Sequence, residues 1–213
     1  MTLIDIFEDM LALGERVKDA EFTPSELTRI LRGMVGTIDI KVKTTRDANV
    51  DINQIVVGGI YDPHEDEAGY PSITIFTAYN PEQKVIKVSD VGWKQLCIDL
   101  IECSGHEIIH QSQYRARDFD IGPHLFVSGC EEESIMHDQN YLGNPDEIDA
   151  YGYSIAVEIY LKHRISKISL RNIQKAAMYK AYCNAFGDQH VIVRQLVEFA
   201  KSYYSQLMLA REV

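Results

Sequence analysis

Cysteine is scarce in this sequence, and the four cysteines form no C-x-x-C pair. Cys97 and Cys103 fall on the same predicted helix, too far apart to bond to each other. The pattern favours free thiols in a reducing compartment over a disulfide framework. We therefore expect a cytoplasmic protein.

Basic residues are also fewer than acidic ones. The chain has 21 lysines and arginines and 32 aspartates and glutamates, which gives a formal net charge of −11. No local cluster of basic residues offsets this charge, so we expect neither nucleic acid nor an anionic membrane as a partner. No apolar run approaches the roughly 20 residues of a membrane span, and no secretory signal opens the chain.

The sequence does contain one chemically specific motif, H-E-x-x-H, over residues 106–110. On a helix, His106 and His110 lie on one face and can share a metal ion. Glu107 follows the first histidine and is close enough to reach a water molecule at that metal. This arrangement is typical of zinc peptidases, with two imidazole ligands and a carboxylate base.

The segment around the motif supports a helix over about 91–114, since apolar residues recur at helical spacing and no proline interrupts them. Without that context, two histidines on a helix would be ordinary surface or core residues. Cys103 lies on nearly the same face as His106, where a small buried thiol is most often a packing residue.

The remaining periodicity predicts an α+β fold. We expect N-terminal helices, then an antiparallel sheet packed on the motif helix, then a C-terminal helical subdomain. The short links between the strands favour an antiparallel meander. The predicted helices span 2–18, 24–36, 144–163, 169–186 and 188–212, and the predicted strands span 37–42, 54–61, 72–79 and 84–88.

We expect a single domain over residues 1–213. It comprises N-terminal helices over 1–36, the sheet and motif helix over 37–117, a long loop over 118–143 and C-terminal helices over 144–213. The loop has no sustained period, and a loop of this length usually has a function or is disordered. We expect it to cover the cleft, which favours narrow specificity. The oligomeric state stays open.

A catalytic zinc needs a third protein ligand, and the elongated motif that ends in a third histidine is absent, because Ala116 stands at that position. Glu147 is the best candidate, 37 residues after His110 and in the first turn of a new helix. Its alternative role is a capping box with Asn144. His124, His137 and Asp149 remain open as ligands, as do manganese, iron and cobalt in place of zinc.

H-E-I-I-H followed by a glutamate in an E-x-x-A context resembles the gluzincin type of zinc metallopeptidase. The resemblance covers about residues 72–160 and implies a zincin-like fold, one Zn²⁺ per chain bound by His106, His110 and Glu147, and Glu107 as the base. Many gluzincins carry an aspartate after the alanine, but Tyr151 stands here, so Asp149 or a backbone carbonyl would orient a ligand histidine. The short acidic chain also resembles small metallopeptidases of tailed phages, which implies host cytoplasm or a virion as its location.

The sequence therefore predicts a zinc-dependent metallopeptidase (a hydrolase) that acts on a protein or peptide. Glu107 would take a proton from the attacking water and pass it to the leaving amine. An edge strand, 72–79, would pair with an extended substrate. The alternative is a non-catalytic binding or structural protein that keeps the metal site. Candidates for stabilising the oxyanion or orienting a ligand are Tyr141, Tyr151, Tyr153, Asp149, His124 and His137.

Overall fold

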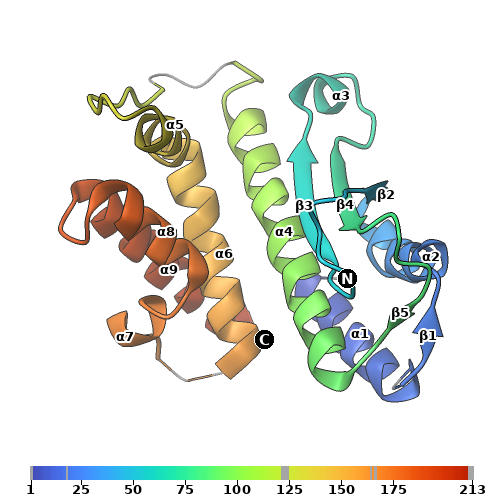
Figure 1. Cartoon of the computed structure of the whole chain (residues 1–213). Coiled ribbons are helices and arrows are strands. Elements are labelled where there is room, and N and C mark those ends of the chain that lie inside the picture. Colours follow the sequence, from blue (N-terminus) through green and yellow to red (C-terminus); the bar gives the residue numbers. More distant parts are fainter. Residues whose placement is uncertain (1, 18, 121–124, 164, 166, 211–213) are drawn as a thin grey trace. The chain divides into compact units, whose positions relative to one another are not determined.

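A computed structural model describes residues 2–17, 19–120, 125–163, 165 and 167–210. The chain forms two compact units, Met1–Gln111 and Ser112–Val213. The boundary falls within one long helix, α4 (Asp90–Ala116), which carries the H-E-x-x-H motif (Figure 1). This helix agrees with the one predicted over 91–114.

The first unit opens with the two predicted helices, α1 (Leu3–Val17) and α2 (Pro24–Val35). Helix α1 buries Ile6, Phe7 and Met10, the apolar stripe expected of an amphipathic helix. Its Gly14 lies against the indole of Trp93, where a Cβ atom would come within 2.4 Å of the ring. The Trp93 indole N–H donates to the Met10 carbonyl oxygen at 2.7 Å, so α1 is fixed to the start of α4.

Helix α2 begins with a capping box. The Thr23 hydroxyl accepts from the Glu26 backbone N–H, and the Glu26 carboxylate accepts from the Thr23 backbone N–H at 2.9 Å. We expect Thr23→Ala to lower the free energy of unfolding by about 1 kcal/mol, because it leaves a helix N–H without its cap. Urea unfolding of the variant beside the wild type measures this difference. Equal midpoints would contradict the prediction.

The main sheet has three strands in the order β2–β4–β3, which are β2 (Ile40–Arg46), β4 (Ile73–Tyr79) and β3 (Val56–Tyr61). Strands β3 and β4 pair antiparallel, whereas β2 and β4 pair parallel. The predicted antiparallel meander is therefore wrong. The prediction assumed that strands adjacent in sequence pair with each other, but β4 inserts between β2 and β3.

Strand β4 takes the centre because it is the most buried of the three, with only Phe76 and Ala78 partly exposed. The expectation that 72–79 is an edge strand for substrate is wrong for the same reason. Among the described residues, β3 and β2 form the two edges of this sheet. The fourth predicted strand shortens to β5 (Ile86–Lys87), which pairs antiparallel with β1 (Glu21–Phe22) in a separate two-stranded sheet.

Two local elements differ from their predicted form. A 3₁₀ turn over Gly36–Ile38 delays the start of β2. The acidic segment after β3 is a short helix, α3 (Pro63–Glu67), because the Asp62 carboxylate caps it by accepting from the backbone N–H groups of His64 and Glu65. His64 is exposed.

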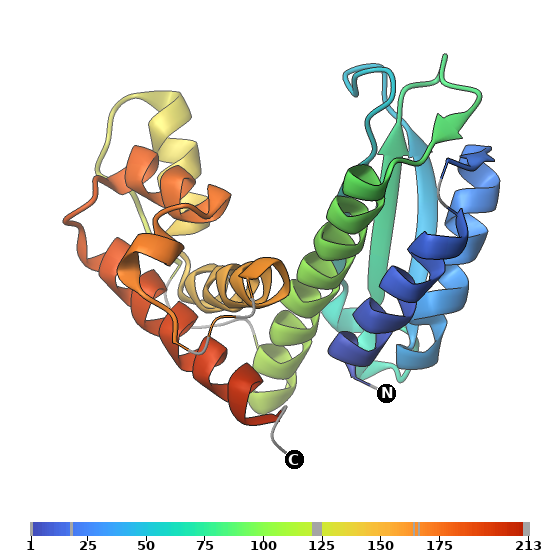
Figure 2. The same cartoon turned by 90° about the horizontal axis from the view of Figure 1, so that it is seen from below.

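Helices of the first unit pack on the face of the sheet that carries Thr44, Thr77 and Gly59, whereas Val56 and Ile60 on the other face of β3 are exposed. Helix α2 packs against β2, with α1 beside it. Thr28 of α2 contacts Thr44 and Thr77 on this face. In the first-unit part of α4, Cys103 and Glu107 lie against Gly59 of β3 on the same face. Figure 2 shows α1 and α2 in blue and α4 in green next to the strands.

The second unit is helical and contains the last turn of α4. Helices α6 and α9 form its main packed pair, and Gly152 of α6 permits their close approach, since a Cβ atom there would lie 2.4 Å from Phe199. The helices after α4 are α5 (Glu133–Leu142), α6 (Pro145–His163), α7 (Leu170–Ile173), α8 (Ala177–Phe186) and α9 (Val191–Ala210).

Two predictions for the second unit need correction. The segment predicted as a loop over 118–143 contains helix α5, and the helix predicted over 169–186 is divided into α7 and α8. The described helices and small sheets confirm the α+β class. Within the described residues, none of the helices has the length and apolar character needed to cross a membrane.

Candidate metal centre

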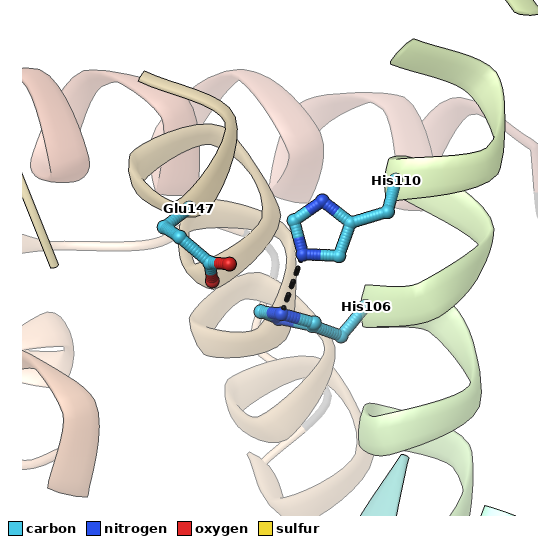
Figure 3. A group of neighbouring side chains, drawn as sticks. All are labelled: His106, His110 and Glu147. Carbon is cyan, nitrogen blue, oxygen red and sulfur yellow. Dashed lines mark hydrogen bonds between the residues drawn. The ribbon is translucent and has the colours of Figure 1, made fainter. Parts of the chain in front are cut away.

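Helix α4 brings the two motif histidines together on one side. His106 and His110 are one turn apart, and their Nε2 atoms lie 3.0 Å from each other (Figure 3). Their rings meet edge to face at 82°. Two nitrogens bound at ordinary distances to one tetrahedral zinc lie roughly 3.3 Å apart. The pair is therefore close to the spacing that a shared ion requires.

Glu107 follows His106 by one residue, a rotation of about 100° around the helix. Its side chain lies against β3 in the first unit, next to Gly59 and Cys103. Only 7% of Glu107 and 8% of His106 are exposed. Glu107 is therefore a buried carboxylate that neighbours the histidine pair on the same helix.

Cys103 is a packing residue in this arrangement. Burial, with the negative charge of Glu107 as the next cause, raises the pKa of the Cys103 thiol. A protonated thiol is a poor metal ligand, since the thiolate is the form that binds. Cys103 also contacts β3 at Gly59. Its expected structural role agrees with this position.

Gln111 anchors α4 immediately after the second histidine. Its side-chain amide donates to Asp66 at 3.1 Å and to the Ser72 hydroxyl at 3.0 Å. Asp66 is only 8% exposed and also accepts from the Tyr61 hydroxyl at 3.0 Å. The network joins α4 to α3 and to the residue before β4, which are far apart in the chain, so sequence spacing gives no signal for it.

Glu147 stands in the first turn of α6, as predicted. The Asn144 side chain caps this helix by accepting from the Asp146 backbone N–H at 3.1 Å. The Asn144 backbone N–H, which a capping box would direct to Glu147, donates to the Tyr141 carbonyl oxygen at 3.1 Å. Capping of α6 therefore does not require the Glu147 carboxylate.

His106, His110 and Glu147 form a group that could hold a metal ion. Each offers one ligand atom, and the three atoms lie within 4.8 Å of one another. Figure 3 shows the Glu147 carboxylate with the two imidazole rings. Two imidazoles and one carboxylate suit zinc chemically and leave a fourth position for water or substrate. The donor set fits the expected cofactor, although it does not identify the metal.

A polar network in the second unit fixes the start of α6 to the last turn of α4. The Gln113 amide donates to the Asp146 carbonyl oxygen at 3.1 Å and to the Asp149 carboxylate at 2.9 Å. Arg117 makes a bidentate ion pair with the Asp146 carboxylate at 2.6 and 3.1 Å. Helical spacing could have indicated that Gln113 is part of the site, because Gln113 lies two turns after His106 on the same face of α4.

Asp149 takes part in this network rather than contacting a histidine. One of its carboxylate oxygens accepts from Gln113, and the other accepts from the Tyr203 hydroxyl at 2.8 Å. The suggestion that Asp149 orients a ligand histidine therefore finds no support in these bonds. It instead connects α4, α6 and α9 within the second unit.

Two of the tyrosine candidates lie together in the second unit. The hydroxyls of Tyr141 and Tyr151 are 3.3 Å apart. Desolvation of its phenol raises the pKa of Tyr141, and the hydrogen bond to Tyr151 and the charge of Glu147 raise it further. Tyr141 therefore keeps its proton at neutral pH and can donate a hydrogen bond. In contrast, Tyr153 packs edge to face on Tyr203.

Of the two histidine candidates, the structure describes only His137. The His137 side chain is 83% exposed on α5, with Asp138 as an ionic neighbour at 3.8 Å. Among the described residues, the group that could hold a metal does not include it. His124 lies outside the described residues.

Comparison with known proteins identifies no relative. No family, curated protein or solved structure matches this chain. The side chains and their geometry are therefore the basis for any function assigned to it.

Proposed function

We propose that this chain is a zinc-dependent metallopeptidase of zincin-like fold, with His106, His110 and Glu147 as metal ligands and Glu107 as the general base. One observation carries the proposal: two imidazole nitrogens 3.0 Å apart on α4 stand next to a buried carboxylate that is separate from them. A site that only stores or structurally binds zinc has no need of that fourth group.

The proposed reaction adds water across a peptide bond. Zinc, when bound, supplies Lewis-acid polarisation of the peptide carbonyl and acidifies water. Glu107 accepts a proton from the water as its oxygen bonds to the carbonyl carbon. Glu107 then gives that proton to the nitrogen of the breaking carbon–nitrogen bond, which leaves as an amine. Among the tyrosine candidates, Tyr141 is the proposed donor to the developing oxyanion, because it lies close enough to Glu147 for that carboxylate to raise its pKa.

The peptide substrate is proposed to lie along β3 rather than β4. The Asp62 backbone N–H donates to the Ser72 carbonyl oxygen at 2.9 Å. With the strand register, this bond identifies the residues of β3 whose backbone groups bond to β4. In an antiparallel pair the alternate residues direct their N–H and C=O groups outward. The backbone groups of Val57 and Gly59 therefore face the free edge, where an extended peptide can add as a strand.

Removal of the metal tests the proposal. We expect about one zinc per chain in protein purified without chelator. Stripping the metal with 1,10-phenanthroline should lower the melting temperature by roughly 5–10 °C, because a ligand present at about 100 times its Kd stabilises by about 2.7 kcal/mol. Zinc added back should restore both the melting temperature and peptide cleavage. Manganese, iron and cobalt are added in parallel to identify the preferred metal.

The outcomes separate the possible functions. A folded chain that takes up no metal would reject the site. Zinc binding without cleavage, both on casein and on proteins of a cell extract, would favour a non-catalytic binding protein. Cleavage of one protein in the extract, without cleavage of casein, would establish a peptidase of narrow specificity.

A further inference from the structure

Two consecutive glycines lie in the middle of strand β3. Glycine has a low preference for strands and weakens them, so Gly58 and Gly59 require a local reason. Successive residues of a strand face opposite sides of the sheet. The two positions therefore meet different surroundings although they are neighbours in the chain.

The surroundings of the two glycines differ sharply. A Cβ atom placed on Gly58 would find nothing within 4 Å. A Cβ atom placed on Gly59 would lie 2.7 Å from Glu107 Oε1, 2.8 Å from Glu107 Cγ and 2.8 Å from Cys103 Sγ. Real Cβ atoms do not approach other atoms this closely. The side chain of Glu107 therefore fills the space that any side chain at position 59 would need.

This contact joins the base to the edge of the sheet. The backbone N–H and C=O groups of Gly59 point away from β4, toward the free edge of β3, while Glu107 lies over the same residue. A peptide that pairs with this edge would therefore lie next to the residue on which the Glu107 carboxylate rests. Gly59 would therefore contact both the side chain of the base and the backbone of the substrate.

We infer that Gly59 is a positioning residue for Glu107: the absent side chain fixes where the carboxylate lies relative to the edge of β3. The consequence for catalysis rests on the proposed peptidase function, whereas the geometric relation between Gly59 and Glu107 does not. The atoms that alanine would displace belong to the side chains of Glu107 and Cys103, which can rotate. Gly59→Ala should consequently move Glu107 without unfolding the sheet.

Gly59→Ala is compared with Gly58→Ala, a matched control with the same chemical change one residue away. Each zinc-loaded protein is labelled with [¹³Cδ]glutamate, and the Glu107 signal is assigned by its loss in Glu107→Gln. At one fixed pH, Gly59→Ala should shift the Glu107 carboxyl signal, and Gly58→Ala should leave it in place. Zinc content and melting temperature should match the wild type in both variants.

The second measurement is of kcat and KM, once a substrate has been identified. Gly59→Ala should lower kcat by about 10²-fold with little change in KM, because a misplacement of about 1 Å costs that much. Gly58→Ala should keep the wild-type kcat. In the Glu107→Gln background, Gly59→Ala should have no further effect, because the base it positions is already absent.

The two proposals fail in different ways. An unmoved Glu107 signal in Gly59→Ala, or equal effects of the two alanine variants, would overturn the positioning role. A shifted signal in a wild-type-like fold that cleaves no peptide would instead reject the peptidase function and leave the contact between Gly59 and Glu107 established.

Discussion

Glu107→Gln should bind zinc as the wild type does and yet cleave peptide about 10²–10⁴-fold more slowly, the usual contribution of a positioned general base. Glutamine has nearly the same shape and keeps the contact with Gly59, so neither α4 nor the histidine pair should change. The amide cannot accept the proton of the attacking water. The measurement is kcat at saturating substrate, together with the zinc content of the same preparation.

The control for this prediction is a carboxylate on the same helix that lies outside the motif. Asp99 lies on α4 two turns before Glu107, and its carboxylate accepts from Gln95 at 2.6 Å. Asp99→Asn makes the same exchange of carboxylate for amide and should keep wild-type turnover. Normal cleavage by Glu107→Gln would show that the base is another group.

Glu147→Ala should remove most of the metal from the chain. Loss of the carboxylate reduces the ligand set to two imidazoles, so the affinity should fall by more than the roughly 10–100-fold that loss of an outer-shell partner costs. Elemental analysis after dialysis, followed by competition with a chromogenic chelator, gives the zinc content and the change in Kd. Because Asn144 caps α6 without Glu147, the helix and the melting temperature of the metal-free protein should change little.

Glu158→Ala is the matched control for the ligand prediction. Glu158 lies on the same helix and pairs with Lys162 at 2.6 Å, one turn away on α6. A partly exposed pair of this kind contributes at most about 1 kcal/mol, so this variant should keep its zinc. Full zinc in both variants would show that Glu147 is not the third ligand. Loss of zinc from both would indicate a general effect of altering α6.

The helices and the histidine pair were predictable because both depend on local spacing. Residues four apart share a face on any α-helix, so His106 and His110 converge wherever the segment is helical. The capping box of α2 and the proline at the start of α6 follow equally from neighbouring residues. The division of the helix predicted over 169–186 was missed, since nothing as strong as proline marks the break after Ile173.

The strand order was not predictable by the same means. Strand pairing joins residues far apart in the chain, and short links indicate only which strands can pair. The decision that β4 is central depends on burial of both its faces, which the finished fold determines. Because β4 is central and β3 is an edge strand, the proposed substrate-binding strand is β3 and not β4.

The sequence by itself determined the chemistry available to this protein: a helix that carries two imidazoles on one face, a carboxylate next to them, and a second acidic residue at the start of a later helix. Only the tertiary structure decided which groups surround that chemistry. It placed Gly59 under Glu107, attached Gln111 to Asp66 and Ser72, and attached Gln113 to Asp149. The physical reason is that helical geometry is set by hydrogen bonds between near neighbours, whereas these contacts form only when distant segments pack.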